Sequence, residues 1–116
     1  MRPQPAPAPT SLAPPCEYLI YDLDGSLSVV PLLMATTRVG RGLRADLRFD
    51  DATVSRRHAL IVRTPVGGRL LDDRSLNGVF VNGERVDRRL LRDGDQILIG
   101  RQWLHFVRLE PTHAAP

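Results

Sequence analysis

The side chains best suited to chemistry lie in four short polar motifs that separate apolar runs. The motifs are Gly40-Arg41, Ser55-Arg56-Arg57-His58, Ser75-Leu76-Asn77-Gly78 and Asn82-Gly83. Guanidinium groups bind phosphate or carboxylate through charge-assisted hydrogen bonds, and hydroxyl and amide groups add further hydrogen bonds. Short polar motifs between strands form loops, where binding residues concentrate. The motifs therefore predict a site for a small anionic group.

Ser55 and His58 also raise the possibility of a hydrolase, because a histidine can activate a serine nucleophile. A catalytic triad further needs an orienting group and an oxyanion site, and Ser55 does not lie in a nucleophile-elbow motif. His105 and His113 lie far along the chain, and no two histidines have the spacing of zinc ligands. The sequence therefore predicts a binding protein that is not an enzyme and uses no cofactor or metal.

Length and charge restrict the class of protein. The 116-residue chain suits a single domain of moderate core size. The net charge of +3 permits acidic partners without requiring them. All sixteen basic residues are arginines, and they are scattered among acidic residues instead of forming the stripe of a nucleic-acid-binding protein. A polyanion-binding or nucleic-acid-binding module without selectivity for one small anionic group is the alternative function.

The compartment follows from cysteine usage and hydropathy. Cys16 is the only cysteine, so the chain has no disulfide framework. No apolar stretch approaches the roughly 20 residues that span a bilayer, and prolines interrupt the N-terminal segment where a signal peptide would be apolar. We expect a cytoplasmic monomer that does not bind membranes.

The chain divides into three expected regions. Residues 1–16 hold six of the ten prolines and predict a disordered tail, because they cannot bury enough apolar surface to fold. Residues 17–109 form the domain, and residues 110–116 form a frayed C-terminus. Thr10 is a possible phosphosite in the tail, and its phosphorylated form would be a ligand for the protein's own site.

The region between the two ends predicts an all-β fold. Short segments rich in β-branched and aromatic residues are separated by turn motifs, at 18–21, 27–30, 36–39, 46–49, 59–63, 69–72, 79–81, 84–86, 96–99 and 102–109. Asn82-Gly83 suits a type I′ turn, because both residue types tolerate positive φ, and Gly67-Gly68 predicts another hairpin turn. No segment has a sustained helical apolar period. We expect a β-sandwich of two sheets with about 10–11 short strands.

These motifs resemble the forkhead-associated (FHA) domain, a module that recognises phosphothreonine peptides. The resemblance covers roughly residues 18–107. It rests on the order and spacing of Gly40-Arg41, Asp46-Leu47-Arg48-Phe49-Asp50, Ser55-Arg56-Arg57-His58-Ala59, Ser75-Leu76-Asn77-Gly78, Asn82-Gly83 and Asp93-Gly94-Asp95. It implies a stand-alone, non-catalytic adaptor of the bacterial type. Its partners would be threonine-phosphorylated proteins, such as a Ser/Thr kinase or its substrates.

The resemblance also implies roles for individual residues. The phosphopeptide-binding residues would be Arg41, Ser55, Arg56, Arg57, Leu76 and Asn77. Arg41, Ser55 and Arg56 would contact the phosphate and Asn77 the peptide backbone, whereas Arg57 faces either solvent or the peptide flank. The residues that support the binding loops would be Gly40, His58, Ser75, Gly78, Asn82 and Gly83, with the ring of His58 tying the loops together. By charge, Arg44, Arg57 and Arg74 would favour acidic residues beside the phosphothreonine.

Two positions depart from the family's pattern. Leu76 stands where many members have threonine or another polar residue, and Val79 replaces the usual threonine. The missing hydroxyl at position 76 removes one hydrogen bond to phosphate, whereas we expect the backbone N–H of Leu76 to remain available. A charge-assisted hydrogen bond is worth about 1.5–3 kcal/mol. We therefore expect weaker phosphate binding than in members with the full pattern, but not its loss.

Overall fold

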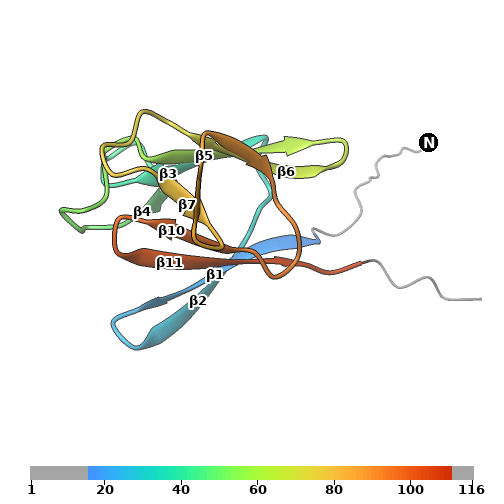
Figure 1. Ribbon diagram of the computed structural model, residues 1–116. Helices are drawn as coiled ribbons and strands as arrows, with labels where there is room; N and C mark the ends of the chain where they lie inside the picture. Colours follow the sequence, from blue (N-terminus) through green and yellow to red (C-terminus); the bar gives the residue numbers. More distant parts are fainter. Residues whose placement is uncertain (1–15, 111–116) are drawn as a thin grey trace, which may run out of the picture.

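Residues 16–110 are described by a computed structural model of the protein. They form eleven strands in two sheets that stack face to face (Figure 1). The six-stranded sheet has the order β2(Ser26–Pro31), β1(Glu17–Leu23), β11(Gln102–Arg108), β10(Gln96–Ile99), β7(Val79–Val81) and β8(Glu84–Val86). The five-stranded sheet has the order β4(Leu47–Arg48), β3(Thr36–Gly40), β5(Ala59–Thr64), β6(Gly67–Asp72) and β9(Arg88–Leu90). The prediction of an all-β two-sheet sandwich is confirmed.

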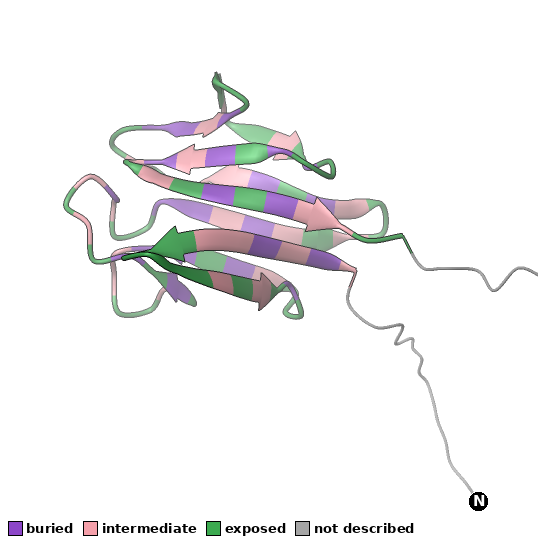
Figure 2. Ribbon diagram, turned by 90° about the horizontal axis from the view of Figure 1, so that it is seen from below, coloured by how far each residue is buried: buried purple, intermediate pink, exposed green. Residues whose placement is uncertain are grey.

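The core lies between the two sheets because apolar residues alternate with polar ones along the strands. On β5 the side chains of Ala59 and Ile61 are buried, and on β11 those of Leu104 and Phe106 are buried. Figure 2 shows this alternation as bands of buried and exposed residues along the strands. Tyr21 also closes over the core edge-on, with its ring centroid 5.0 Å from that of Phe49. The need to bury one face fixes the register of each strand, and the register in turn fixes the positions of the loops at the strand ends.

The structure departs from the expected strands in two places. β9 was missed because Arg88-Arg89-Leu90 has no apolar alternation, yet it pairs antiparallel with the edge of β6. The turn expected at Gly67-Gly68 lies two residues earlier, and both glycines belong to β6. A Cβ at Gly68 would lie 3.1 Å from the carboxylate of Glu17, and the Gly68 N–H donates to that carboxylate at 3.2 Å. Close packing of β6 against β1 thus accounts for Gly68.

Strand direction brings several loops to one end of the sandwich, and hydrogen bonds join four of them to one another. They connect β3 to β4, β4 to β5, β6 to β7, and β10 to β11. The first and last described residues lie at the opposite end (Figure 1). In residues 16–110 no helix is long and apolar enough to cross a membrane. The expectations for a tail up to residue 15, for Thr10 and for residues 111–116 lie outside the described residues.

Candidate anion-binding site

Two loops that carry the predicted arginines are joined through their backbones. The N–H of Arg41 donates to the carbonyl of Ser55 at 2.9 Å, and the N–H of Gly42 donates to the carbonyl of Arg56 at 3.1 Å. Gly40 has no room for a side chain, since a Cβ would collide with the carbonyl oxygen of Arg56. Glycine therefore permits the close approach that places Arg41 beside Ser55.

Arg41 is held in place while most of its donors stay free. Its Nε donates to the carbonyl of Val54 at 2.9 Å. In the part of the chain that the structure describes, the two terminal nitrogens have no hydrogen bond or carboxylate partner. These nitrogens form a planar fork that matches two oxygens of a phosphate. Arg41 is therefore an anchored, unpaired cation at the edge of the loops.

Ser55 links the β4–β5 loop to the β6–β7 loop. Its Oγ accepts the backbone N–H of Leu76 at 2.9 Å, and its hydroxyl proton remains available for an anion. The expectation that the N–H of Leu76 is free is therefore wrong, because Ser55 occupies it. The side chain of Leu76 is 84% exposed. The two loops thus offer a hydroxyl from Ser55 and an exposed apolar side chain from Leu76.

His58 is completely buried, with 0% of its surface exposed. Its Nδ1 accepts the N–H of Ser55 at 3.0 Å, so its Nε2 carries the proton and donates to the carbonyl of Gly78 at 2.8 Å. Both ring nitrogens are thus used to join the β4–β5 loop to the β6–β7 loop. The ring has no free nitrogen that could act as a general base on Ser55.

The β6–β7 loop presents Asn77 to solvent. The Asn77 amide donates to the carbonyl of Thr53 at 2.9 Å, which leaves its carbonyl oxygen and one N–H for a ligand. Ser75 shapes the loop, because its Oγ donates to Asp72 at 3.0 Å and accepts the N–H of Gly78 at 2.9 Å. Gly78 has φ of 89°, a conformation that favours glycine. Asn77 is therefore oriented by a loop with its own internal bonds.

The neighbouring side chains of Arg56 and Arg57 differ in their partners. Arg57 makes a bidentate contact with Asp73, with Nε–Oδ2 at 3.1 Å and Nη2–Oδ1 at 2.8 Å. The hydrogen bonds and the charge of Asp73 raise the pKa of Arg57. The guanidinium of Arg56 is exposed and has no partner among the described residues. The carbonyl of Arg56 accepts the N–H of Gly42, which places Arg56 next to the loop that carries Arg41, whereas the bridge to Asp73 directs Arg57 to the β6–β7 loop.

Asn82 and Gly83 do not join these loops. β7 carries the chain from Gly78 to the far end of the sandwich, where Asn82 has φ of 52° and Gly83 has φ of 85°, as expected for the predicted turn. The amide of Asn82 bonds to Asp95 at 2.9 Å and to the N–H of Gln96 at 2.9 Å. Asn82 therefore supports the start of β10, and the role expected for it beside the binding loops does not fit its position.

The family model described as the FHA domain matches residues 37–100, which is more than half of the chain. The chain belongs to the FHA-domain family. A Mycobacterium tuberculosis ABC transporter ATP-binding/permease protein is 49% identical to it over 70 residues, covering 60% of this chain and 8% of the transporter.

Two further matches share the domain. The glycogen accumulation regulator GarA of Mycolicibacterium smegmatis is 43% identical over 72 residues, covering 62% of this chain and 46% of GarA. A structure solved in work on phosphothreonine-dependent FHA domain interactions superimposes with a TM-score of 0.76 at 35% identity, covering 84% of this chain and 99% of that chain. The chain spans less than half the length of either of these curated relatives.

The structure of this FHA domain also shows supporting residues outside the set of expected site residues. Asp51 accepts hydrogen bonds from the N–H and Oγ1 of Thr53, at 2.8 and 2.6 Å, and from Gln102 at 2.7 Å. The Oγ1 of Thr53 also accepts the N–H of Arg101 at 2.9 Å. The signal was an Asp-X-Thr turn two residues before Ser55. In residues 16–110 no three His, Cys, Asp or Glu side chains are placed to hold a metal ion.

Asp51 makes the stability of the FHA domain depend on pH. Hydrogen bonds from Thr53, foremost from its hydroxyl, lower the pKa of Asp51 from 3.8 to about 2. Because the folded pKa is the lower one, the stabilisation is present above about pH 4 and is lost as the pH falls toward 2. Asp51→Asn should therefore lower Tm at pH 7 and flatten the fall in Tm between pH 4 and pH 2, as measured by thermal denaturation. Asp50→Asn, at the exposed neighbouring carboxylate, is the control and should change Tm little at pH 7. An unchanged Tm profile for Asp51→Asn would contradict this role.

Proposed function

We propose that this FHA domain binds phosphothreonine segments of partner proteins as an adaptor in Ser/Thr-kinase signalling. The observation that carries the proposal is the anchored, unpaired guanidinium of Arg41 beside the free hydroxyl proton of Ser55. Arg56 adds a second unpaired cation, and Asn77 can hold the peptide backbone through its free amide groups. The relative solved in work on phosphothreonine-dependent interactions supports the choice of ligand.

The proposal has no catalytic step. Both ring nitrogens of His58 are occupied, so Ser55 has no base beside it. The proposed domain limits are residues 17–109, since β1 begins at Glu17 and the N–H of Leu109 closes on the carbonyl of Cys16 at 2.7 Å. We place the protein in the cytoplasm as a monomer, where a lone cysteine stays reduced. Its partners would be a threonine kinase or the substrates of such a kinase.

Titration of matched peptides by fluorescence anisotropy tests the proposal. Peptides selected from an oriented phosphothreonine library should bind, the phosphoserine versions more weakly, and the unphosphorylated versions not at all. Equal binding of all three would contradict the proposal. Random duplex DNA is the comparison for the alternative, because polyanion binding driven by counterion release weakens steeply with salt.

Leu76→Thr should tighten phosphothreonine-peptide binding by about tenfold, because a hydroxyl at this exposed position adds one hydrogen bond to phosphate, worth about 1.5 kcal/mol. The backbone bond from Leu76 to Ser55 is unaffected by the substitution. Isothermal titration calorimetry measures the change in Kd. Leu76→Val is the matched control, since valine has the branched shape of threonine but carries a methyl group in place of the hydroxyl. Equal affinity of the two variants would show that a side chain at position 76 does not reach the phosphate.

A further inference from the structure

A groove with a volume of about 610 Å³ adjoins the site on the outer side of the five-stranded sheet. One wall is the β3–β4 loop with Leu43 and Arg44, and the other is formed by Arg57 and Asp73. Arg38 and Leu60, neighbours on β3 and β5, also line the groove. The groove contains residues that the anion site does not use, so it is a separate feature of the molecule.

Both walls of the groove are fixed before any ligand arrives. In the β3–β4 loop the N–H of Ala45 donates to the carbonyl of Gly42 at 3.1 Å. Asp46 and Arg38 exchange two bonds, with the Asp46 N–H donating at 2.8 Å and its carboxylate accepting the Arg38 N–H at 2.7 Å. The bidentate bridge between Arg57 and Asp73 holds the opposite wall. Preformed walls reduce the ordering cost of binding.

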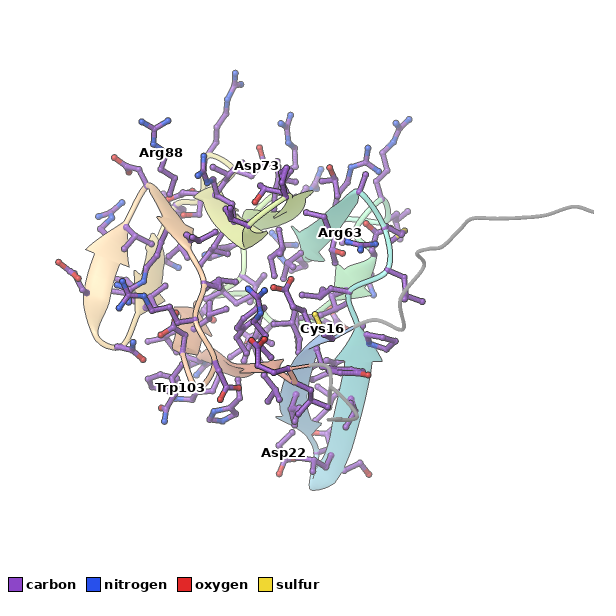
Figure 3. All side chains as sticks on the ribbon, turned by 90° about the vertical axis from the view of Figure 1, so that its right-hand side faces the viewer. Cys16, Asp22, Arg63, Asp73, Arg88 and Trp103 are labelled. Atoms are coloured by element: carbon purple, nitrogen blue, oxygen red, sulfur yellow. The ribbon has the colours of Figure 1, made fainter. Side chains whose placement is uncertain are left out.

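The groove has unbalanced positive charge. Arg38, Arg44 and Arg56 line it, and none of their guanidinium groups has an ion pair or hydrogen bond with the described residues. Asp73, the acidic residue in the lining, is already neutralised by Arg57. Figure 3 shows many nitrogen-tipped side chains projecting from the five-stranded sheet, on the side where Asp73 and Arg88 are labelled. A carboxylate would therefore meet the free guanidinium groups of Arg38 and Arg44 here, beside that of Arg56, which the proposed function assigns to the phosphate.

The groove also has an apolar component that suits side chains with aliphatic stems. Leu43 is 90% exposed at the rim, and Leu60 is partly buried beside Arg38. A glutamate side chain offers methylene groups for such surfaces and a carboxylate for the arginines. A flat basic patch without apolar walls would not favour this combination. The lining therefore fits short acidic side chains on an extended peptide.

We propose that this groove binds Asp or Glu side chains that flank the phosphothreonine in the same peptide. The inference rests on the proposed function, because the phosphothreonine places the flank next to the groove. Arg56 connects the two sites, since its side chain lines the groove and its carbonyl accepts the N–H of Gly42 beside Arg41. The groove therefore selects among phosphothreonine peptides by the charge of one flank.

The test compares phosphothreonine peptides that differ only in flanking charge. One series carries two glutamates on the N-terminal side and another carries them on the C-terminal side, each with a glutamine version as its neutral match. An exposed ion pair is worth about 0.2–1 kcal/mol, so two pairs should tighten binding by about 2- to 30-fold for one of the two series. The gain should shrink in 0.5 M salt. Equal affinity of the glutamate and glutamine peptides in both series would overturn the inference.

Two variants tie the gain to the groove. Arg38→Gln with Arg44→Gln should remove the glutamate preference and leave the affinity for neutral-flank peptides unchanged. Arg88→Gln with Arg92→Gln removes the same charge from exposed residues outside the groove and should keep the preference. If the first variant weakens neutral-flank and acidic-flank peptides equally, the arginines act on the phosphate and the inference fails. Binding by no phosphothreonine peptide at all would instead overturn the proposed function.

Discussion

Arg41→Ala is expected to abolish phosphothreonine-peptide binding while the domain stays folded. The terminal nitrogens of Arg41 are the free fork at the site, and the substitution removes them together with their charge. Two charge-assisted hydrogen bonds at about 1.5–3 kcal/mol each correspond to a loss of more than 100-fold in affinity. Isothermal titration calorimetry with the best library peptide measures the loss. Retention of wild-type affinity would contradict the assignment of Arg41 to the phosphate.

Arg63→Ala is the matched control for this prediction. Like Arg41, Arg63 donates a guanidinium hydrogen bond to a backbone carbonyl, that of Leu33 at 2.9 Å, but it lies on β5 away from the binding loops. We expect its removal to leave peptide affinity unchanged. Arg41→Lys separates charge from geometry, because lysine keeps the charge and loses the planar fork. The peptide affinity of Arg41→Lys should fall between those of the wild type and Arg41→Ala.

His58→Ala is expected to destabilise the domain by about 3–5 kcal/mol and to weaken peptide binding. The substitution leaves the N–H of Ser55 and the carbonyl of Gly78 without partners and opens a cavity in a fully buried position. Each unsatisfied buried group costs about 1–3 kcal/mol, and the cavity adds to this. Chemical denaturation measures the free energy of unfolding, and peptide titration below the unfolding range measures the effect on the loops.

Two further variants separate a structural role of His58 from a general effect of losing histidine. The side-chain oxygen of His58→Asn can replace Nδ1 as the acceptor for Ser55 but cannot reach Gly78, so its stability should be intermediate. His105→Ala removes an exposed histidine from β11 and should change the free energy of unfolding by less than about 0.5 kcal/mol. A stability of His58→Ala equal to that of the wild type would contradict the bridging role.

Local chemistry made much of the fold and site predictable. The Asn82-Gly83 turn follows from the positive φ that both residue types tolerate, and the alternation of β5 and β11 predicts two buried faces. The Gly40-Arg41 and Ser55 motifs occur in loops because they interrupt apolar strands. β9 was not predicted because Arg88-Arg89-Leu90 has low local strand propensity. Its strand conformation is stabilised by pairing with the edge of β6, which is a tertiary contact.

The pairing of polar groups across loops was not predictable in the same way. Arg57 meets Asp73 only because β5 and β6 place them side by side, and the bridge redirects a side chain assigned to the ligand. The N–H of Leu76 is occupied because folding brings it to Ser55. Asn82 follows the family's sequence pattern, but the direction of β7 places it far from the loops. Such partners depend on tertiary contacts that no local pattern specifies.

The backbone hydrogen bond between Leu109 and Cys16 holds the two ends of the domain side by side. Their backbone bond brings the entry and exit points of the domain together, at the end away from the loops (Figure 1). A longer polypeptide could carry such a unit as an inserted domain, because the two connections lie next to each other. The binding loops would stay exposed without an added linker, since they lie at the other end. Attachment of the domain to a sensor chip through either described end would likewise leave its loops facing the solution.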